Sequence, residues 1–207
     1  MKAILSEARA ALAATLVLGL VCCGIYPAVV TFLGQAMFRD RADGSLIRDP
    51  SGRIVGSRLI GQAFTADKYF QSRTSAAGNG YDGLSSGGSN LGPTSKKLRD
   101  SVASNVADYR AHNGLATNAT VPADAATASG SGLDPHISVE NARLQSARVA
   151  AARGLSAEVV RALVTHHTAP PVLGFLGDPG VNVVTLNLAL DQEHPSAPGQ
   201  AGVPASH

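Results

Sequence analysis

The chain contains very little cysteine and no tryptophan. Its two cysteines, Cys22 and Cys23, are adjacent within the most hydrophobic stretch, so every residue after position 23 belongs to a cysteine-free sequence. A disulfide framework and a cysteine zinc site are therefore excluded for that part of the chain. Glycine and proline gather in particular segments, a distribution that indicates a folded domain with loops and a tail.

A strong excess of charge is also missing. The 17 Lys and Arg residues nearly balance the 15 Asp and Glu residues, which leaves a formal net charge of +2. Electrostatics therefore identifies neither nucleic acid nor an anionic surface as a partner. A length of 207 residues suits one modest core and excludes a large multidomain enzyme.

Catalytic and metal-binding signatures are scarce. Residues 128–132, Ala-Ser-Gly-Ser-Gly, are out of register with the Gly-x-Ser-x-Gly elbow of serine hydrolases. Asp134 and His136 could ligate a metal, or could join Ser129 or Ser131 in a Ser-His-Asp group. Their spacing favours a simpler interpretation, in which Asp134 closes a turn and His136 is hydrogen-bonded. We expect no catalytic residue and no metal site.

Three other patterns also have simpler structural interpretations. The adjacent histidines at 166 and 167 would point about 100° apart on a helix, which disfavours a shared metal ion. The helices expected on either side of residues 153–156 are similar to a helix-turn-helix, but near-neutral charge argues against DNA binding. Residues 84–89 are similar to the signature loop of ABC transporters. An extra serine and the missing Gly-x-x-x-x-Gly-Lys loop favour a structural loop without autonomous ATP hydrolysis.

Residues 10–38 form an uncharged, strongly apolar run. The run is longer than the roughly 20 residues that a helix needs to cross a bilayer. It therefore predicts one transmembrane helix near the amino terminus, with Pro27 tolerated as a kink. A cleaved signal peptide is the alternative, because Gly34 and Ala36 are small. Its hydrophobic region would be about twice the usual length, which favours the anchor.

Charge does not orient this helix. Lys2 and Arg9 precede it and several arginines follow it, and the rule that counts basic residues loses force before a long domain.

After the helix, residues 45–48 and 53–57 flank a turn containing Pro50 and Gly52, which predicts a β-hairpin. Residues 74–93 are rich in Gly, Ser and Asn and are expected to form a long loop.

The second half of the chain contains three helical patterns and one apolar run. We expect helices from Thr94, as N-cap, to Asn113, from Ser138 to Arg153, and from Ser156 to about residue 168. The apolar run 181–190 is expected to be a buried strand, after a turn at 177–180. The predicted fold is a single N-terminal transmembrane helix followed by one mixed α/β domain.

Several segments, in order along residues 5–190, resemble the KdpC subunit family of bacterial Kdp potassium-transporting P-type ATPases. The agreement includes Gly-Ser-Arg-Leu-Ile-Gly-Gln-Ala-Phe (56–64) and Ser-Gly-Gly-Ser-Asn-Leu-Gly-Pro-Thr (86–94), and continues in 69–76, 121–124, 127–138, 148–150, 152–154, 173–177, 181–183 and 186–187. Thr74 replaces the family's usual proline, and Ser95 its usual asparagine. The tail after Asp191 lies outside the resemblance.

The resemblance implies a single-pass subunit of the bacterial cytoplasmic membrane. It implies a cytoplasmic N-terminus (1–9), a transmembrane helix (10–34) and an extracytoplasmic α/β domain (35–190). The composition of residues 191–207, rich in Pro, Ala and Gly, separately predicts a disordered tail. The implied partners are a P-type ATPase subunit, a potassium pore subunit, a small single-helix subunit and membrane lipid, without nucleic acid. This chain lacks the Asp-Lys-Thr-Gly phosphorylation motif, so no autonomous activity is expected.

The family role that the resemblance implies is a catalytic chaperone, which raises the ATP affinity of the ATPase subunit and stabilises assembly. Nucleotide contacts are expected at Ser86, Gly87, Gly88 and Ser89, and loop-shaping or subunit contacts at Asn90, Ser129, Ser131, Asp134 and His136. No cofactor of its own is expected: ATP acts through the complex, and potassium is the transported ion. The alternative is an extracytoplasmic lid or assembly clamp at the mouth of the pore subunit, without a nucleotide role.

Overall fold

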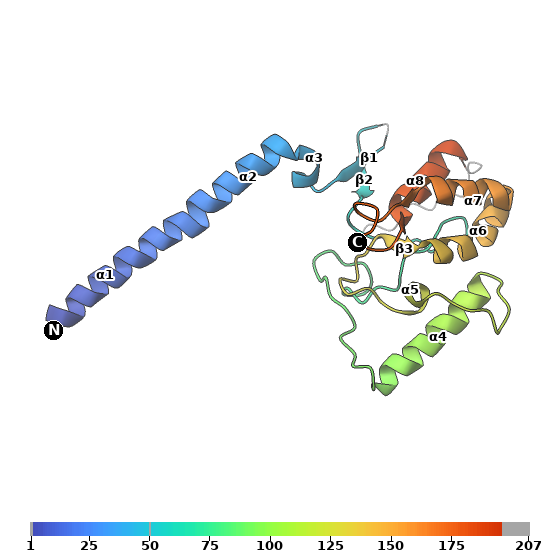
Figure 1. Ribbon diagram of the computed structural model, residues 1–207, viewed down its shortest axis with the longest axis horizontal. Helices are drawn as coiled ribbons and strands as arrows, with labels where there is room; N and C mark the ends of the chain where they lie inside the picture. The colour runs from blue at the N-terminus through green and yellow to red at the C-terminus, as the bar shows by residue number, and fades with distance from the viewer. Residues whose placement is uncertain (1, 50, 196–207) are drawn as a thin grey trace. The chain divides into compact units, whose positions relative to one another are not determined.

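The structure is a computed structural model that describes residues 2–49 and 51–195. The chain divides into two compact units, the first ending at Leu46 and the second beginning at Ile47, and each is described by itself (Figure 1). Pro50 of the predicted turn and residues 196–207 of the predicted tail lie outside the described residues.

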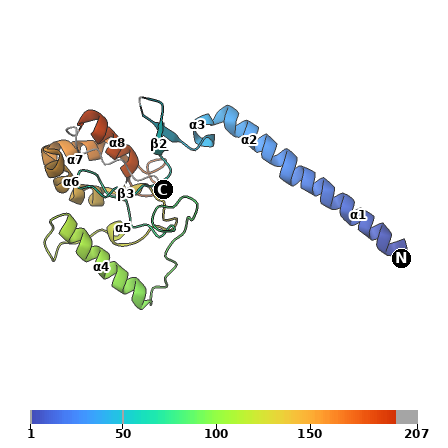
Figure 2. The same ribbon diagram turned by 180° about the vertical axis from the view of Figure 1, so that it is seen from behind.

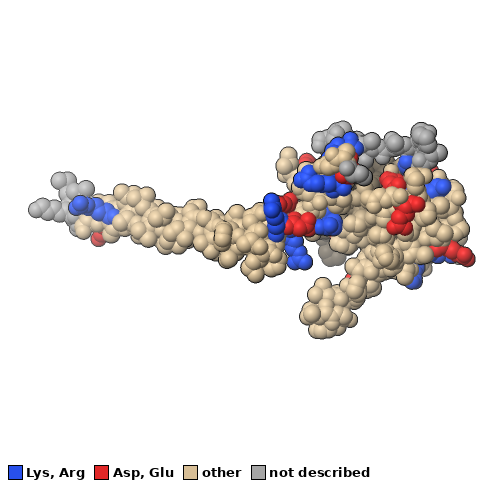
Figure 3. Space-filling model, turned by 90° about the horizontal axis from the view of Figure 1, so that it is seen from above, with Lys and Arg blue, Asp and Glu red and all other residues tan. Residues whose placement is uncertain are grey.

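The first unit is dominated by the long apolar helix that the sequence predicts. It consists of α1 (Lys2–Gly19), a π-helical turn η1 (Leu20–Ile25) and α2 (Tyr26–Met37), drawn as one continuous helix in Figures 1 and 2. Residues Ser6–Met37 are long and apolar enough to span a membrane. Charged side chains gather only towards the two ends of this helix (Figure 3). A short helix, α3 (Arg39–Ala42), follows.

The π-helical turn lies directly before Pro27. The Tyr26 N–H donates to the Val21 carbonyl, five residues back, in place of the usual four. Pro27 has no N–H and its ring crowds the preceding turn, so a wider turn keeps the helix continuous at this point. The kink expected at Pro27 is thus absorbed by a local change in winding.

The predicted hairpin is confirmed, with β1 (Leu46–Arg48) paired to β2 (Ile54–Ser57). Asp49 holds its turn: one carboxylate oxygen accepts hydrogen bonds from the backbone N–H groups of Ser51 and Arg53, both at 2.9 Å. The Ser51 hydroxyl also donates to this carboxylate, and these bonds lower the pKa of Asp49.

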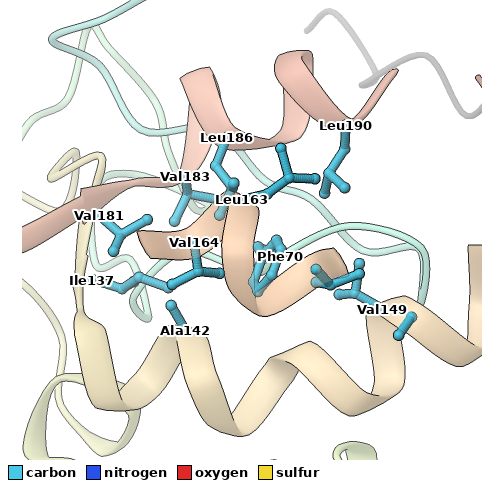
Figure 4. Packing of buried hydrophobic residues seen from close by; sticks show 12 residues of the cluster. Phe70, Ile137, Ala142, Val149, Leu163, Val164, Val181, Val183, Leu186 and Leu190 are labelled. Carbon is cyan, nitrogen blue, oxygen red and sulfur yellow. The ribbon is translucent and has the colours of Figure 1, made fainter. Parts of the chain in front are cut away.

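The core of the second unit lies among three helices and a small antiparallel sheet. The helices are α6 (Val139–Arg153), α7 (Ala157–His166) and α8 (Val183–Glu193). The sheet has the order β3-β5-β4, with β3 (His136–Ser138), β5 (Gly180–Asn182) and β4 (Thr168–Ala169). Ile137 pairs with Val181 across it. Figure 4 shows Phe70 among these elements, and its side chain is fully buried. The predicted mixed α/β fold is confirmed for this unit.

The expectation of a strand over 181–190 was wrong. Only Gly180–Asn182 is a strand, and α8 begins at Val183. The Asn182 side chain accepts a hydrogen bond from the Thr185 N–H at 3.1 Å and so caps the helix. Val183, Leu186 and Leu190 then fall on one buried face, because their spacings of three and four residues match the helical period.

The other predicted helices are confirmed. Ser138 and Ser156 cap α6 and α7, as expected. The helix α4 (Lys96–His112) also forms, but its N-cap is Ser95 and not Thr94: the Ser95 hydroxyl accepts from the Leu98 N–H. A four-residue helix that the sequence did not predict, α5 (Ala123–Ala126), packs against α4. Figures 1 and 2 show α4 and α5 together, apart from the three core helices.

Candidate functional site

The long loop 74–93 contains no helix or strand, as predicted, and folds back onto residues 128–134. We call these two segments the loop pair. The carbonyl of Ser131 accepts from the Gly87 N–H and from the Ser86 hydroxyl, both at 2.9 Å. At the other end, the Ser75 hydroxyl donates to the Gly132 carbonyl at 2.6 Å. The structure therefore brings the predicted residues Ser86 and Gly87 into contact with Ser131.

Glycine allows the two backbones of the loop pair to approach closely. A Cβ on Gly88 would lie 2.9 Å from the Gly130 carbonyl oxygen. A Cβ on Gly132, where φ is +68°, would lie 2.6 Å from the Ala77 nitrogen. Neither distance leaves room for a side chain, so Gly88 and Gly132 serve packing inside the protein, whereas Gly83 and Gly87 have no atom within 4 Å of the Cβ position. Ser89 and Asn90 follow as exposed residues, with Asn90 in the left-handed region.

Asp134 and His136 are arranged as the turn interpretation expects. The Asp134 carboxylate accepts from the His136 N–H at 2.9 Å, and the His136 ring nitrogen Nδ1 lies 3.4 Å from the same oxygen. Arg73 donates to the other oxygen at 3.3 Å. The hydrogen bond from the His136 side chain is the main reason why the pKa of Asp134 is lowered.

The two candidate serines have structural contacts. The Ser131 hydroxyl accepts from the Leu133 N–H at 3.1 Å, which forms a local turn. Ser129 is buried and its N–H donates to the Thr74 carbonyl. Among residues 2–49 and 51–195 there is no group of three or more His, Cys, Asp or Glu side chains that could hold a metal ion.

A cleft of about 750 Å³ lies between α4, α6 and the segments 63–65 and 71–75, and sequence reasoning missed it. Its wall is a hydrogen-bond network in which Asn141 Oδ1 accepts from the Tyr109 hydroxyl at 2.9 Å and from Gln145 Nε2 at 2.8 Å. Burial raises the pKa of Tyr109. Two amides four residues apart on a buried helix face, Asn141 and Gln145, were the available sequence signal.

Two arginines of α6 fix residues 67–69 through hydrogen bonds to their backbone carbonyls. Arg148 donates to the carbonyls of Asp67 and Tyr69, and Arg153 donates to the carbonyl of Lys68. Arg153 also forms an ion pair with Asp191 of α8 at 2.8 Å. Both arginines fall in segments that carry the family resemblance, and their observed contacts are internal.

Within residues 2–49 and 51–195 the structure thus combines one candidate membrane helix with one small α/β unit that carries the loop pair, an arrangement compatible with a membrane protein that has a single N-terminal anchor. A family model described as "KdpC: K+-transporting ATPase, c chain" matches residues 8–192. The chain therefore belongs to the KdpC family and is a subunit of the Kdp potassium-transporting ATPase complex. The resemblance seen in the sequence is confirmed.

Similar proteins agree with this assignment. The "Potassium-transporting ATPase KdpC subunit" of Mycobacterium tuberculosis (strain ATCC 25618 / H37Rv) is 54% identical over 168 residues, which cover 81% of this chain and 88% of that protein. Proteins with the same description from Caulobacter vibrioides (strain NA1000 / CB15N) and Koribacter versatilis (strain Ellin345) are 49% identical. They cover 90% and 87% of this chain, and the matches span 91% and 90% of those proteins.

Proposed function

We propose that this chain is an accessory subunit, without catalytic activity of its own, that raises the ATP affinity of the P-type ATPase subunit and stabilises the assembled potassium pump. The observation that carries the proposal is the family match over residues 8–192, which covers both the apolar helix and the α/β unit. Its partners are the ATPase subunit, the potassium pore subunit and the small single-helix subunit. Potassium is the transported ion, and ATP acts through the complex.

The proposal places the chain as a single-pass protein in the bacterial cytoplasmic membrane, with residues 35–190 outside the cytoplasm. Support comes from the one candidate span in the described residues, Ser6–Met37, and from the family. A domain on that side is separated from cytoplasmic ATP by about 30 Å of hydrocarbon. The effect on ATP affinity must therefore pass through contacts between subunits.

Such coupling requires unequal binding to two states of the pump. A subunit that binds the state with high ATP affinity more tightly, by about 1–3 kcal/mol, raises that affinity by about 5- to 150-fold. A rigid contact surface suits this role better than a mobile one, because ordering a loop on binding costs free energy. The loop pair is rigid in this sense, since Ser86 and Gly87 already bond to Ser131.

The same rigidity favours one competing function, in which the α/β unit is a lid or assembly clamp at the outer mouth of the pore subunit. Both functions require a rigid contact surface. They differ in the ligand for which the apparent affinity of the complex changes. The chaperone alters the apparent affinity for ATP. The lid alters the apparent affinity for potassium.

Potassium-stimulated ATP hydrolysis by the reconstituted complex distinguishes the two, when the ATP and potassium concentrations are varied separately. In the loop pair, Gly88→Ala places a methyl group against the Gly130 carbonyl, whereas Gly83→Ala adds one in open space. We expect Gly88→Ala to raise the KM for ATP at least fivefold and to leave the potassium dependence unchanged, with Gly83→Ala as the matched control. The reverse pattern would support the lid.

A further inference from the structure

An uncharged loop of the second unit, residues 170–177, presents large apolar side chains to solvent. We call it the apolar loop; its sequence is Pro-Pro-Val-Leu-Gly-Phe-Leu-Gly. Val172, Leu173 and Phe175 are 68%, 78% and 74% exposed. Large exposed apolar side chains that are neighbours in one loop are a feature of sites that another surface covers.

Hydrogen bonds hold the apolar loop in one conformation. Val172 and Leu176 exchange two backbone hydrogen bonds of 2.9 Å, and the Gly174 N–H donates to the Pro171 carbonyl at 3.0 Å. The two prolines at its start further restrict the backbone. The apolar side chains are thus displayed on a preformed support, so little conformational entropy is lost when they are covered.

Leu173 adopts a backbone conformation that leucine avoids. Its φ is +56°, in the left-handed region where glycine is favoured, and the next residue is Gly174 at +83°. A leucine at this position strains the isolated protein. An exposed leucine at this position therefore lowers the stability of the free chain. Binding of its side chain to a partner gives a physical reason why leucine, and not glycine, occupies the position.

The sequence on either side of the apolar loop favours a protein partner over a lipid surface. Loops and helices that bind membrane surfaces combine apolar side chains with Lys or Arg, which attract anionic headgroups. The last Lys or Arg of this chain is Arg161, and the residue that follows the loop is Asp178. This composition favours an apolar protein pocket over an anionic bilayer surface.

We propose that the apolar loop is a preformed anchor that inserts Leu173 and Phe175 into an apolar pocket on another protein subunit of the potassium-transporting ATPase complex. The inference rests on membership of the complex, which the proposed function also uses. It is independent of any effect on ATP affinity. A few large apolar groups in a desolvated pocket carry much of the binding free energy of such interfaces.

Photo-crosslinking of the assembled complex tests which surface covers the apolar loop. Benzoylphenylalanine in place of Phe175 keeps an aromatic, apolar side chain and reacts with its nearest neighbour. We expect a crosslink to another protein subunit of the complex. A crosslink to lipid alone, or none, would overturn the proposal. The same group in place of Ile54, which is half-exposed on β2, is the control for non-specific capture.

Leu173→Gly separates docking from folding. Glycine adopts φ near +56° without strain, so the unfolding midpoint of the full chain should stay the same or rise. We expect Leu173→Gly to reduce co-purification with the other subunits in detergent at least tenfold, and Phe175→Ser to do the same. Ile54→Ser is the matched exposed apolar control.

Normal co-purification of Leu173→Gly and Phe175→Ser would overturn the anchor and leave the proposed function standing. The reverse failure is also distinct. If omission of the wild-type chain left the KM for ATP unchanged, the proposed function would fail, whereas the crosslink from position 175 would be unaffected.

Discussion

Asn187 and Phe70, 117 positions apart in the chain, exchange two hydrogen bonds as neighbouring strands would. The Asn187 side chain accepts from the Phe70 N–H at 2.8 Å and donates to the Phe70 carbonyl at 2.9 Å. Gln145 makes the same pair of bonds with the backbone of Gln71, at 2.7 and 3.1 Å. Two buried side-chain amides, one from α8 and one from α6, therefore provide hydrogen-bond partners for the backbone N–H and carbonyl groups of residues 70 and 71, which belong to no strand.

Asn187→Ala should be strongly destabilising. It leaves both the N–H and the carbonyl of Phe70 buried without these partners, and each such group costs about 1–3 kcal/mol. We expect the free energy of unfolding to fall by about 2–4 kcal/mol, measured by denaturation of the full-length chain in detergent. Asn118→Ala, at an exposed position, should change it by less than about 0.5 kcal/mol. Equal effects of the two variants would show that the amide bonds contribute little.

Alanine substitutions at two glycines with the same φ distinguish the stability cost of backbone strain from that of a steric clash. Gly132 and Gly154 both have φ of +68°, but only Gly132 has a backbone atom within 3 Å of the Cβ position. Gly154→Ala should therefore cost about 1 kcal/mol, from the left-handed conformation alone. Gly132→Ala should cost more than twice as much, because the loop pair must separate. Thermal unfolding followed by circular dichroism measures both, and similar midpoints would contradict the close packing of the loop pair.

Asp134 should make stability depend on pH in the acidic range. Its pKa is lowered in the folded protein, mainly by the hydrogen bond from the His136 side chain. The contribution is therefore complete above the usual aspartate pKa of 3.8 and is lost as the pH falls through the lower folded value.

We expect the unfolding midpoint of the wild type to fall more steeply than that of Asp134→Asn as the pH is lowered from about 4 towards 2. The hairpin variant Asp49→Asn, which removes a carboxylate with a pKa lowered mainly by Ser51, reports the same effect at an independent site. Parallel curves for the wild type and Asp134→Asn would contradict the prediction.

Arg153 should be important for stability. Its side chain is 1% exposed and pairs with Asp191, and it also donates to the carbonyls of Lys68 and Leu190. Arg153→Ala leaves these acceptors without the guanidinium, so we expect a loss of about 3 kcal/mol, or roughly 6–12 °C in the unfolding midpoint. Arg143→Ala, on the exposed face of the same helix, is the control. Arg153→Lys should recover only part of the loss, because lysine lacks the planar fork.

Much of the local structure could be predicted from short sequence patterns. The uncharged run of residues 10–38 predicted the apolar helix, because excluding charge over that length is rare outside membrane spans. Ser138 and Ser156 predicted helix starts, because a hydroxyl at the N-cap satisfies a free N–H. The ordered segments that resemble the KdpC family also identified it correctly.

Tertiary structure decided what local patterns leave open. The apolar run 181–190 fits a strand or a buried helix equally well by composition, and the cap at Asn182 together with packing against Phe70 selected the helix. The stacking of Gly88 on Gly130, and the amide bonds of Asn187, join residues tens of positions apart. Capping and periodicity act within a few residues and can be read from the sequence. Close approach and buried hydrogen bonding depend on which distant segments the fold brings together.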